Sequence, residues 1–221
     1  MNSRANRADP GGAARASDVI VEQLRRMIVT LQLEPGAVVT EVYLMELLKC
    51  SRTPLREALQ QLAQEHLVVA VPRRGVWIAD MSVFDFGQLM ETTSWLFRLV
   101  ARLAAEHASS DELDRMAQIL DEAERADAAG DMPRAAELDF EFHSVMAGAS
   151  RNHYAVDALV PLQRLVTRFS FVGFRKSGSA QGAIEDHHRI LEALQARDAD
   201  LADHRATEHA EHGRDRIRAG L

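Results

Sequence analysis

A mainly α-helical fold with one short β-hairpin is predicted from three observations. Apolar residues recur at helical spacing through most of the 221 residues, and two β-rich runs stand close together near residue 70. Turn residues divide the C-terminal part into about six further helical segments. Because 47% of the residues are hydrophobic, the chain can bury a real core, and no apolar run is long enough to cross a membrane.

Three helices are expected in the N-terminal part. The first runs from Ser17 to Leu31 with apolar side chains on one face, and the turn at residues 33–36 ends it. Thr40 is placed to cap the second helix. Its inner face is expected to consist of Leu44, Leu47 and Leu48.

The third helix starts within residues 51–59, the most informative stretch of the chain. Thr53 is placed to cap it, and Pro54 suits a first turn, where a missing N–H costs nothing. Arg52 and Arg56 then flank a helix N-terminus, which is favourable to phosphate. The alternative interpretation is an ordinary capped amphipathic helix with two solvated arginines.

A β-hairpin is predicted directly after the third helix. The β-rich runs Leu67–Val71 and Gly75–Ala79 bracket residues 72–74, which place two arginines at the tip. Helix, helix, third helix and hairpin is the order of a winged helix-turn-helix, a fold that reads DNA.

The N-terminal part resembles the GntR family of bacterial transcription regulators over about residues 17–80. The residues that carry the resemblance are Leu33-Glu34-Pro35-Gly36, Ser51-Arg52-Thr53-Pro54-Leu55-Arg56-Glu57-Ala58-Leu59, Leu67-Val68 and Arg73-Arg74-Gly75, in the family's order and spacing. The resemblance implies that Arg52 and Arg56, with Thr53 between them, lie in the major groove of double-stranded DNA. It also implies that Arg73, Arg74 and Gly75 at the hairpin tip reach the adjacent groove.

Three positions depart from the family pattern. Val42 stands where members often carry an arginine, so one DNA contact is expected to be missing. Lys49 replaces a common turn glycine and Met45 a common small alanine, which makes the tightness of the turn before the third helix a point to test.

Charge and cysteine usage agree with this organisation. The formal net charge is −7, but acidic and basic residues nearly balance between Ala16 and Asp80, so the acidity lies mainly beyond Met81. Residues 1–15 have no apolar segment and are expected to form a flexible tail, residues 16–80 the DNA-binding domain, and residues 81–221 a second domain. Cys50 is alone, which suits a reducing cytoplasm.

The second domain is predicted to be a helical bundle. Helical patterns cover Phe84–Ala108, Ser110–Ala129, Met132–Ala149, His153–Phe171, Ala183–Ala196 and Asp198–Ile217. Asp139 and His143 are four residues apart and project from one face of a helix, as paired metal ligands do. With His187 and His209 they would make a nitrogen-rich set suited to zinc or nickel, although an Asp/His pair at this spacing is often a solvated ion pair.

The bundle resembles the FCD ligand-binding domain of the FadR subfamily of these regulators. The matching residues are Asp139-Phe140-Glu141-Phe142-His143, Ser150-Arg151-Asn152-His153-Tyr154, His187-His188-Arg189-Ile190-Leu191-Glu192-Ala193-Leu194 and His209. The resemblance implies that Asp139, His143, His187 and His209 bind the metal, that His188, His204 and His212 are exposed, and that Asn152 caps a helix.

The effector class is less determined by the sequence. Thr93 and Phe97 stand where many relatives carry an arginine and a glutamate, so the usual organic-acid effector does not simply follow. Arg98, Arg102, Arg164 and Arg168 are substitutes for that arginine or else ordinary solvated helix arginines. A carboxylate that completes the metal shell is the favoured effector.

The sequence thus predicts a cytoplasmic, homodimeric, metabolite-responsive DNA-binding regulator and no enzyme. Such a dimer would bind an inverted-repeat operator. Two alternatives remain at this point. One is a metal-dependent enzyme acting on a small organic acid, disfavoured because no zincin-like motif or general base accompanies the histidines. The other is a helical interaction module whose winged domain binds protein.

Overall fold

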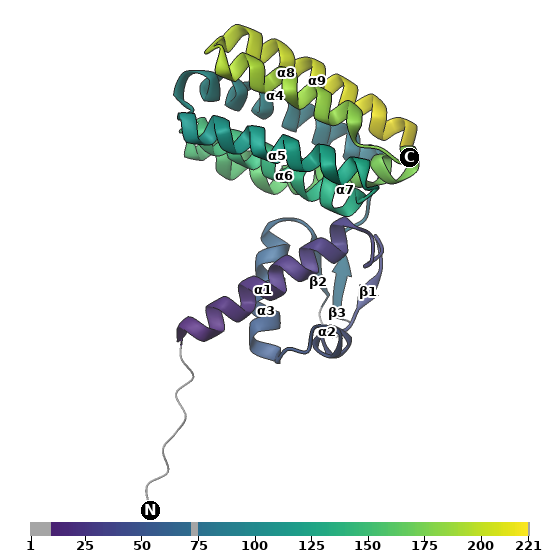
Figure 1. Ribbon diagram of the computed structural model, residues 1–221. Coiled ribbons are helices and arrows are strands. Elements are labelled where there is room, and N and C mark those ends of the chain that lie inside the picture. The colour runs from purple at the N-terminus through teal and green to yellow at the C-terminus, as the bar shows by residue number, and fades with distance from the viewer. Residues whose placement is uncertain (1–9, 72–74, 221) are drawn as a thin grey trace, which may run out of the picture. The chain divides into compact units, whose positions relative to one another are not determined.

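The computed structural model describes residues 10–71 and 75–220, and within them the chain forms two compact units that divide between Asp80 and Met81 (Figure 1). The first unit is a winged helix-turn-helix and the second is a bundle of helices, which confirms the predicted fold class. None of the helices in the described part of the chain is long and apolar enough to span a membrane.

The first helix of the winged unit, α1, spans Pro10–Val29 and begins earlier than the sequence predicted. Three of the four residues directly before Ser17 are alanines, which favour a helix, so part of the segment expected to be a tail continues the helix. Leu24 and Ile28 on α1 are buried, as are Leu55 and Leu62 on α3 (Arg52–Gln64), and the two helices pack against each other. Packing against α1 thus supports α3 on its buried face.

Helix α2 spans Glu41–Leu48, and Thr40 caps it by accepting a hydrogen bond from the backbone N–H of Tyr43, as predicted. Leu44 is buried as expected, but Leu47 is 41% exposed. The expectation that Leu47 belongs to the inner face was therefore wrong, because this short helix buries only a narrow stripe.

The start of α3 also differs from the prediction. Ser51, not Thr53, occupies the N-cap position, and it makes no side-chain capping hydrogen bond. A cap accepts from the N–H two or three residues further on, and Pro54, the third helical residue, lacks the second of these donors. The helix begins at Arg52, so both arginines lie in its first turn and a half.

The wing is a three-stranded antiparallel sheet in the order β1-β3-β2. Strands β2 (Val68–Val71) and β3 (Gly75–Ile78) form the predicted hairpin, with Val71 opposite Gly75. The sequence did not predict β1 (Val38–Val39), whose two residues pair with β3.

The bundle contains six helices in the described part of the chain: α4 (Val83–His107), α5 (Ser110–Ala128), α6 (Met132–Ala149), α7 (His153–Ser177), α8 (Gln181–Gln195) and α9 (Ala199–Gly220). Helices α4 and α9, α5 and α6, α6 and α7, and α8 and α9 lie side by side (Figure 1). Asn152 caps α7 by accepting the N–H of Ala155, as the resemblance implied.

Helix α7 continues to Ser177, beyond the end predicted at Phe171. Phe171 and Phe174 are buried on its inner face, and this burial outweighs the low helix propensity of Gly173. Gly178 ends the helix in the left-handed conformation, with φ 75°.

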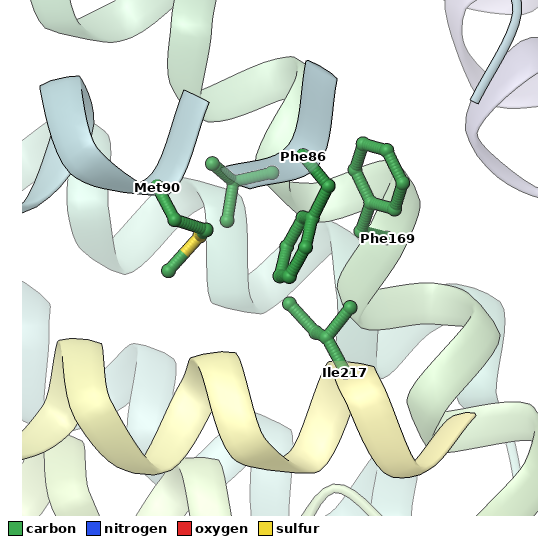
Figure 2. Close-up of a cluster of buried hydrophobic side chains, with 5 residues drawn as sticks. Phe86, Met90, Phe169 and Ile217 are labelled. Atoms are coloured by element: carbon green, nitrogen blue, oxygen red, sulfur yellow. The ribbon is translucent and has the colours of Figure 1, made fainter. Parts of the chain in front are cut away.

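One end of the bundle is closed by an apolar cluster from three helices. Figure 2 shows Phe86 and Met90 of α4, Phe169 of α7 and Ile217 of α9 pointing toward one another. The rings of Phe86 and Phe169 lie 4.8 Å apart between centroids. The cluster thus joins α4, α7 and α9 through buried apolar contacts.

Candidate functional site

Two arginines are presented at the N-terminus of α3. The side chains of Arg52 and Arg56 are 61% and 62% exposed, which fits contact with a partner. Both lie beside Glu41, the first residue of α2. The Nε of Arg56 donates to the two carboxylate oxygens at 3.0 and 3.1 Å, and the Nε of Arg52 is 3.9 Å from Oε2.

Of the other residues predicted to bind DNA, the structure describes Thr53 and Gly75. Thr53 is exposed beside the two arginines. Gly75 opens β3 with φ 111°, and a Cβ there would lie 2.3 Å from the carbonyl oxygen of Val39. A glycine is therefore required at position 75, because the backbone of β1 lies too close for a side chain. Arg73 and Arg74 lie outside the described residues.

The departures at Val42, Met45 and Lys49 leave the turn before α3 intact. Lys49 adopts the left-handed conformation, with φ 51° and ψ 43°, that the common glycine would take easily. The backbone N–H groups of Lys49 and Cys50 both donate to the carbonyl of Met45, so the turn is closed. Val42 is 53% exposed.

A histidine cluster lies inside the bundle where α6, α8 and α9 meet. Potential ligand atoms of His143, His187 and His209 all lie within 4.8 Å of one another. The Nε2 atoms of His143 and His187 are 3.2 Å apart. Oδ1 of Asp139 is 3.9 Å from the Nε2 of His143 and 3.8 Å from that of His187. The structure thus brings together all four residues predicted to be ligands.

Burial distinguishes these four residues from their neighbours. The side chains of Asp139, His143 and His187 are each no more than 8% exposed, and that of His209 is 12% exposed. A solvated Asp/His ion pair, the alternative open at the sequence level, does not fit this burial. By contrast, 39%, 65% and 49% of the side chains of His188, His204 and His212 are exposed.

The electrostatics of the cluster follow from burial. Burial raises the pKa of Asp139 to about 7, against the nearby charge of Arg216, and it lowers the pKa of His143 to about 3. Burial, reinforced by neighbouring histidines and Arg216, also holds the pKa values of His187 and His209 well below their usual range. The three imidazoles are therefore neutral at pH 7, which is the form that binds metals.

The residues present fit a metal ion. Buried atoms without a hydrogen-bond partner in the described structure include Oδ2 of Asp139 and the Nδ1 atoms of His143 and His209. Leaving such atoms unsatisfied costs about 1–3 kcal/mol each, so a cation that engages some of them would relieve that cost. Three nitrogen donors and one carboxylate are a donor set suited to zinc.

Two phenylalanine rings pack against the histidines of the cluster. Phe142 stacks on His187 with ring centroids 4.4 Å apart, and Phe97 packs 4.7 Å from His143 and 5.2 Å from His209. Phe97, one of the two departures from the resemblance on the first bundle helix, therefore forms part of the cluster's apolar surround.

A cavity of about 220 Å³ opens beside the cluster, which contributes Asp139, His143 and His209 to its wall. Most of the apolar wall comes from α4, α7 and α9: Met90, Phe97, Val166, Phe174, Ala210 and Ile217. Small or uncharged polar residues add Thr93, Ser94, Gln163, Ser170, Ser177 and Ser179, and Arg216 adds a cation.

None of the four arginines proposed from the sequence is among the described residues that line this cavity. Arg98 and Arg102 form ion pairs with Asp203 and Asp200 at 2.5 and 2.6 Å. The guanidinium of Arg164 lies 3.9 Å over the ring of Phe140, and Arg168 is 1% exposed.

Sequence reasoning missed Arg216 and its partner Asp186. Nη2 of Arg216 lies 2.9 Å from Oδ2 of Asp186, whose side chain is 4% exposed. A signal was present in the spacing, since His209, Gly213 and Arg216 recur at helical intervals and all line the cavity.

This winged helix-turn-helix, followed by a helical bundle, defines the class of DNA-binding transcription regulators with a C-terminal helical domain. Residues 16–78 match the model of the bacterial regulatory proteins of the gntR family, and residues 88–212 match that of the FCD domain. The chain belongs to the GntR family of regulators and carries an FCD domain.

Relatives over most of the chain agree with this assignment. The Nta operon transcriptional regulator of Aminobacter aminovorans is 30% identical, over 79% of this chain and 81% of the relative. The transcriptional repressor RspR of Escherichia coli is 27% identical, over 84% and 82%. These relatives are regulators, which supports a regulator over the metal-dependent enzyme considered above.

Solved structures share the fold. That of Escherichia coli McbR/YncC has a TM-score of 0.81 at 20% identity and covers 92% of this chain and 97% of its own. That of a GntR transcriptional regulator from Rhodococcus sp. RHA1 has a TM-score of 0.75 at 23% identity and covers 94% and 99%.

Proposed function

We propose that this GntR-family regulator belongs to the FadR subfamily and acts in the cytoplasm as a homodimer on an inverted-repeat operator. The bundle would hold one divalent metal ion, zinc or nickel, and bind a small carboxylate effector beside it. The single observation that carries the DNA part is the exposed pair of arginines in the first turn and a half of α3.

The proposed DNA contact rests on the way α3 is supported. Its inner face, with Leu55 and Leu62, is buried in the unit, while Arg52 and Arg56 point away from that core. A helix N-terminus with exposed arginines can place base contacts and phosphate contacts together. A two-fold symmetric dimer would present two such helices to the two halves of a palindromic site.

The test is binding to operator DNA selected from genomic fragments. We expect affinity to fall steeply as salt rises, because bound phosphates release counterions. Arg52→Ala should cost about 1–3 kcal/mol of binding free energy if the residue reads a base. Arg125→Ala, which removes the same charge from an exposed position on α5, is the matched control and should bind as wild type does.

Binding that ignores both salt and Arg52 would instead favour a winged domain that contacts protein. Size measurements in solution and on the DNA complex test the dimer, for which two chains per operator are expected.

The metal proposal rests on the buried cluster of three neutral histidines and Asp139. A bound ion would engage buried donor atoms that otherwise lack partners. Nitrogen-rich sites favour zinc or nickel over calcium or magnesium, which take oxygen ligands.

Elemental analysis of the purified chain tests this site. We expect about one divalent ion per chain, lost when His143→Ala and His187→Ala are combined. His188→Ala changes the exposed histidine next to His187 and is expected to retain the ion. Equal metal content in the double variant and in wild type would remove the proposed ligand set.

Effector binding would change operator affinity through two arrangements of the protein. A ligand can shift such an equilibrium only by the difference in its affinity for the two arrangements. Operator titrations with and without a bound effector therefore measure the coupling directly.

A further inference from the structure

We propose that Arg216 recognises the acid group of the effector in this cavity. The proposal rests on the proposed function, in which the cavity beside the histidine cluster is the effector site. It adds the residue that selects the effector's charge.

Arg216 is placed to meet a ligand. It lies on α9 in the same cavity wall as His209, two helical turns earlier on that helix. Its side chain is 33% exposed, so the guanidinium is partly sheltered yet reachable. A partly buried arginine attracts an anion more strongly than a fully solvated arginine does, because water screens the charges less.

A buried carboxylate fixes the guanidinium close to the cluster. Oδ2 of Asp186 is 2.9 Å from Nη2 of Arg216 and 4.0 Å from Nδ1 of His209. Oδ2 of Asp186 is thus close to both Arg216 and His209, so these two side chains are near each other. Because both also line the cavity, an acid group in it can lie near Arg216 and the histidines together. Asp186 thereby acts as a positioning residue.

The charge balance around Asp186 favours an anion. Its carboxylate also accepts from Nη1 of Arg189 at 3.0 Å, and Nδ1 of His212 lies 3.1 Å away. Two guanidinium groups thus share one buried carboxylate, which leaves an excess of positive charge. Among the described residues that line the cavity, the only carboxylate is Asp139, which belongs to the proposed metal site.

The rest of the wall limits the size and character of the ligand. At about 220 Å³, the cavity is smaller than the roughly 300–1,000 Å³ of typical drug-sized ligand sites. Met90 and Ile217, seen in Figure 2, are apolar neighbours of the site, while Thr93 and Ser170 offer hydroxyl groups. This wall suits an acid with a short body that carries apolar and hydroxyl groups.

Calorimetric titration of the metal-loaded full chain tests the assignment. The probes are lactate, succinate and citrate, with lactamide as the neutral counterpart of lactate. We expect wild type to bind at least one acid and not to bind lactamide. Arg216→Gln should weaken acid binding about tenfold to a hundredfold, because charge-assisted hydrogen bonds are lost. Arg216→Lys, which keeps the charge without the planar fork, should fall in between.

The matched control is Arg218→Gln, which removes the same charge from an exposed position on the same helix outside this cavity. It should bind acids as wild type does. Circular dichroism and metal content are measured on every variant. If Arg216→Gln does not fold, Arg216→Met, which keeps an apolar stem, replaces it.

The outcomes separate this inference from the proposed function. Equal acid affinity of wild type and Arg216→Gln, or equal losses in Arg216→Gln and Arg218→Gln, overturns the role of Arg216. If acid binding by the Arg216→Gln variant still requires the metal, the metal-assisted effector site stands, but without a role for Arg216. Failure of wild type to bind any of the three acids overturns the anion assignment, while operator binding and metal content of the same preparation decide the proposed function.

Discussion

Glu41 is the residue that lies next to both arginines of α3. Its carboxylate contacts Arg56 through both oxygens and lies near Arg52, and all three side chains are accessible to solvent. Ion pairs this exposed contribute about 0–1 kcal/mol, so the contact orients the arginines without locking them. The carboxylate also places a negative charge where DNA phosphates would approach.

Glu41→Gln is therefore expected to raise affinity for non-specific DNA about threefold, within the factor of roughly five that 1 kcal/mol allows. The ratio of operator to non-specific affinity should fall, because the arginines lose their orienting partner. Fluorescence anisotropy with operator and scrambled duplexes measures both quantities. Glu46→Gln, an equal charge change at an exposed position on the same helix, should leave the ratio unchanged.

Single residues were predictable to different extents. The spacing of Asp139 and His143 follows from one helix, so the sequence alone placed them together. The choice of His187 over His188 came from a family resemblance, and the burial of one and exposure of the other agree with it. The helical spacing from His209 could have indicated Arg216, but its partner Asp186 lies thirty residues earlier on another helix, and no local pattern connects Arg216 with Asp186.

At the scale of elements, the turn between α2 and α3 carries a conformational cost. Lys49 holds φ at 51°, a left-handed conformation that costs a residue with a Cβ roughly 1–2 kcal/mol. Glycine avoids this cost but loses about 0.5–1 kcal/mol of chain entropy on folding.

Lys49→Gly should therefore stabilise the winged unit by about 0.5–1 kcal/mol. Lys49→Ala removes the same charge but keeps a Cβ, so it should bring no such gain. Urea denaturation of both variants measures the difference. A gain of equal size in the alanine variant would show that charge, and not backbone conformation, is responsible.

Helix ends were the least predictable elements. The start of α3 was misplaced because Pro54 was placed at the first helical position, whereas it is the third residue of the first turn, which also tolerates a proline. The end of α7 was misplaced because tertiary burial of Phe174 overrides a sequence rich in glycine and serine. The two-residue strand β1 has no periodicity to detect and exists through its pairing with β3.

At the scale of the whole molecule, the chain consists of two compact units, each with its own core. The proposed metal ligands lie on α6, α8 and α9, all within the second unit. A ligand that binds only the folded state stabilises the unit that holds it. Metal removal should therefore act on the bundle and leave the winged unit unchanged.

Thermal unfolding with and without a chelator tests this expectation. A metal present at 100 times its Kd adds about 2.7 kcal/mol, which corresponds to a shift of about 10 °C in the Tm of the bundle. Far-ultraviolet circular dichroism follows mainly the long bundle helices, and fluorescence of Trp77 in a Trp95→Phe variant follows the wing. The chelator should lower the Tm seen by circular dichroism and leave the Tm seen by Trp77 fluorescence unchanged. Equal shifts of both signals would show that the units unfold together, and no shift of either would argue against a metal in the bundle.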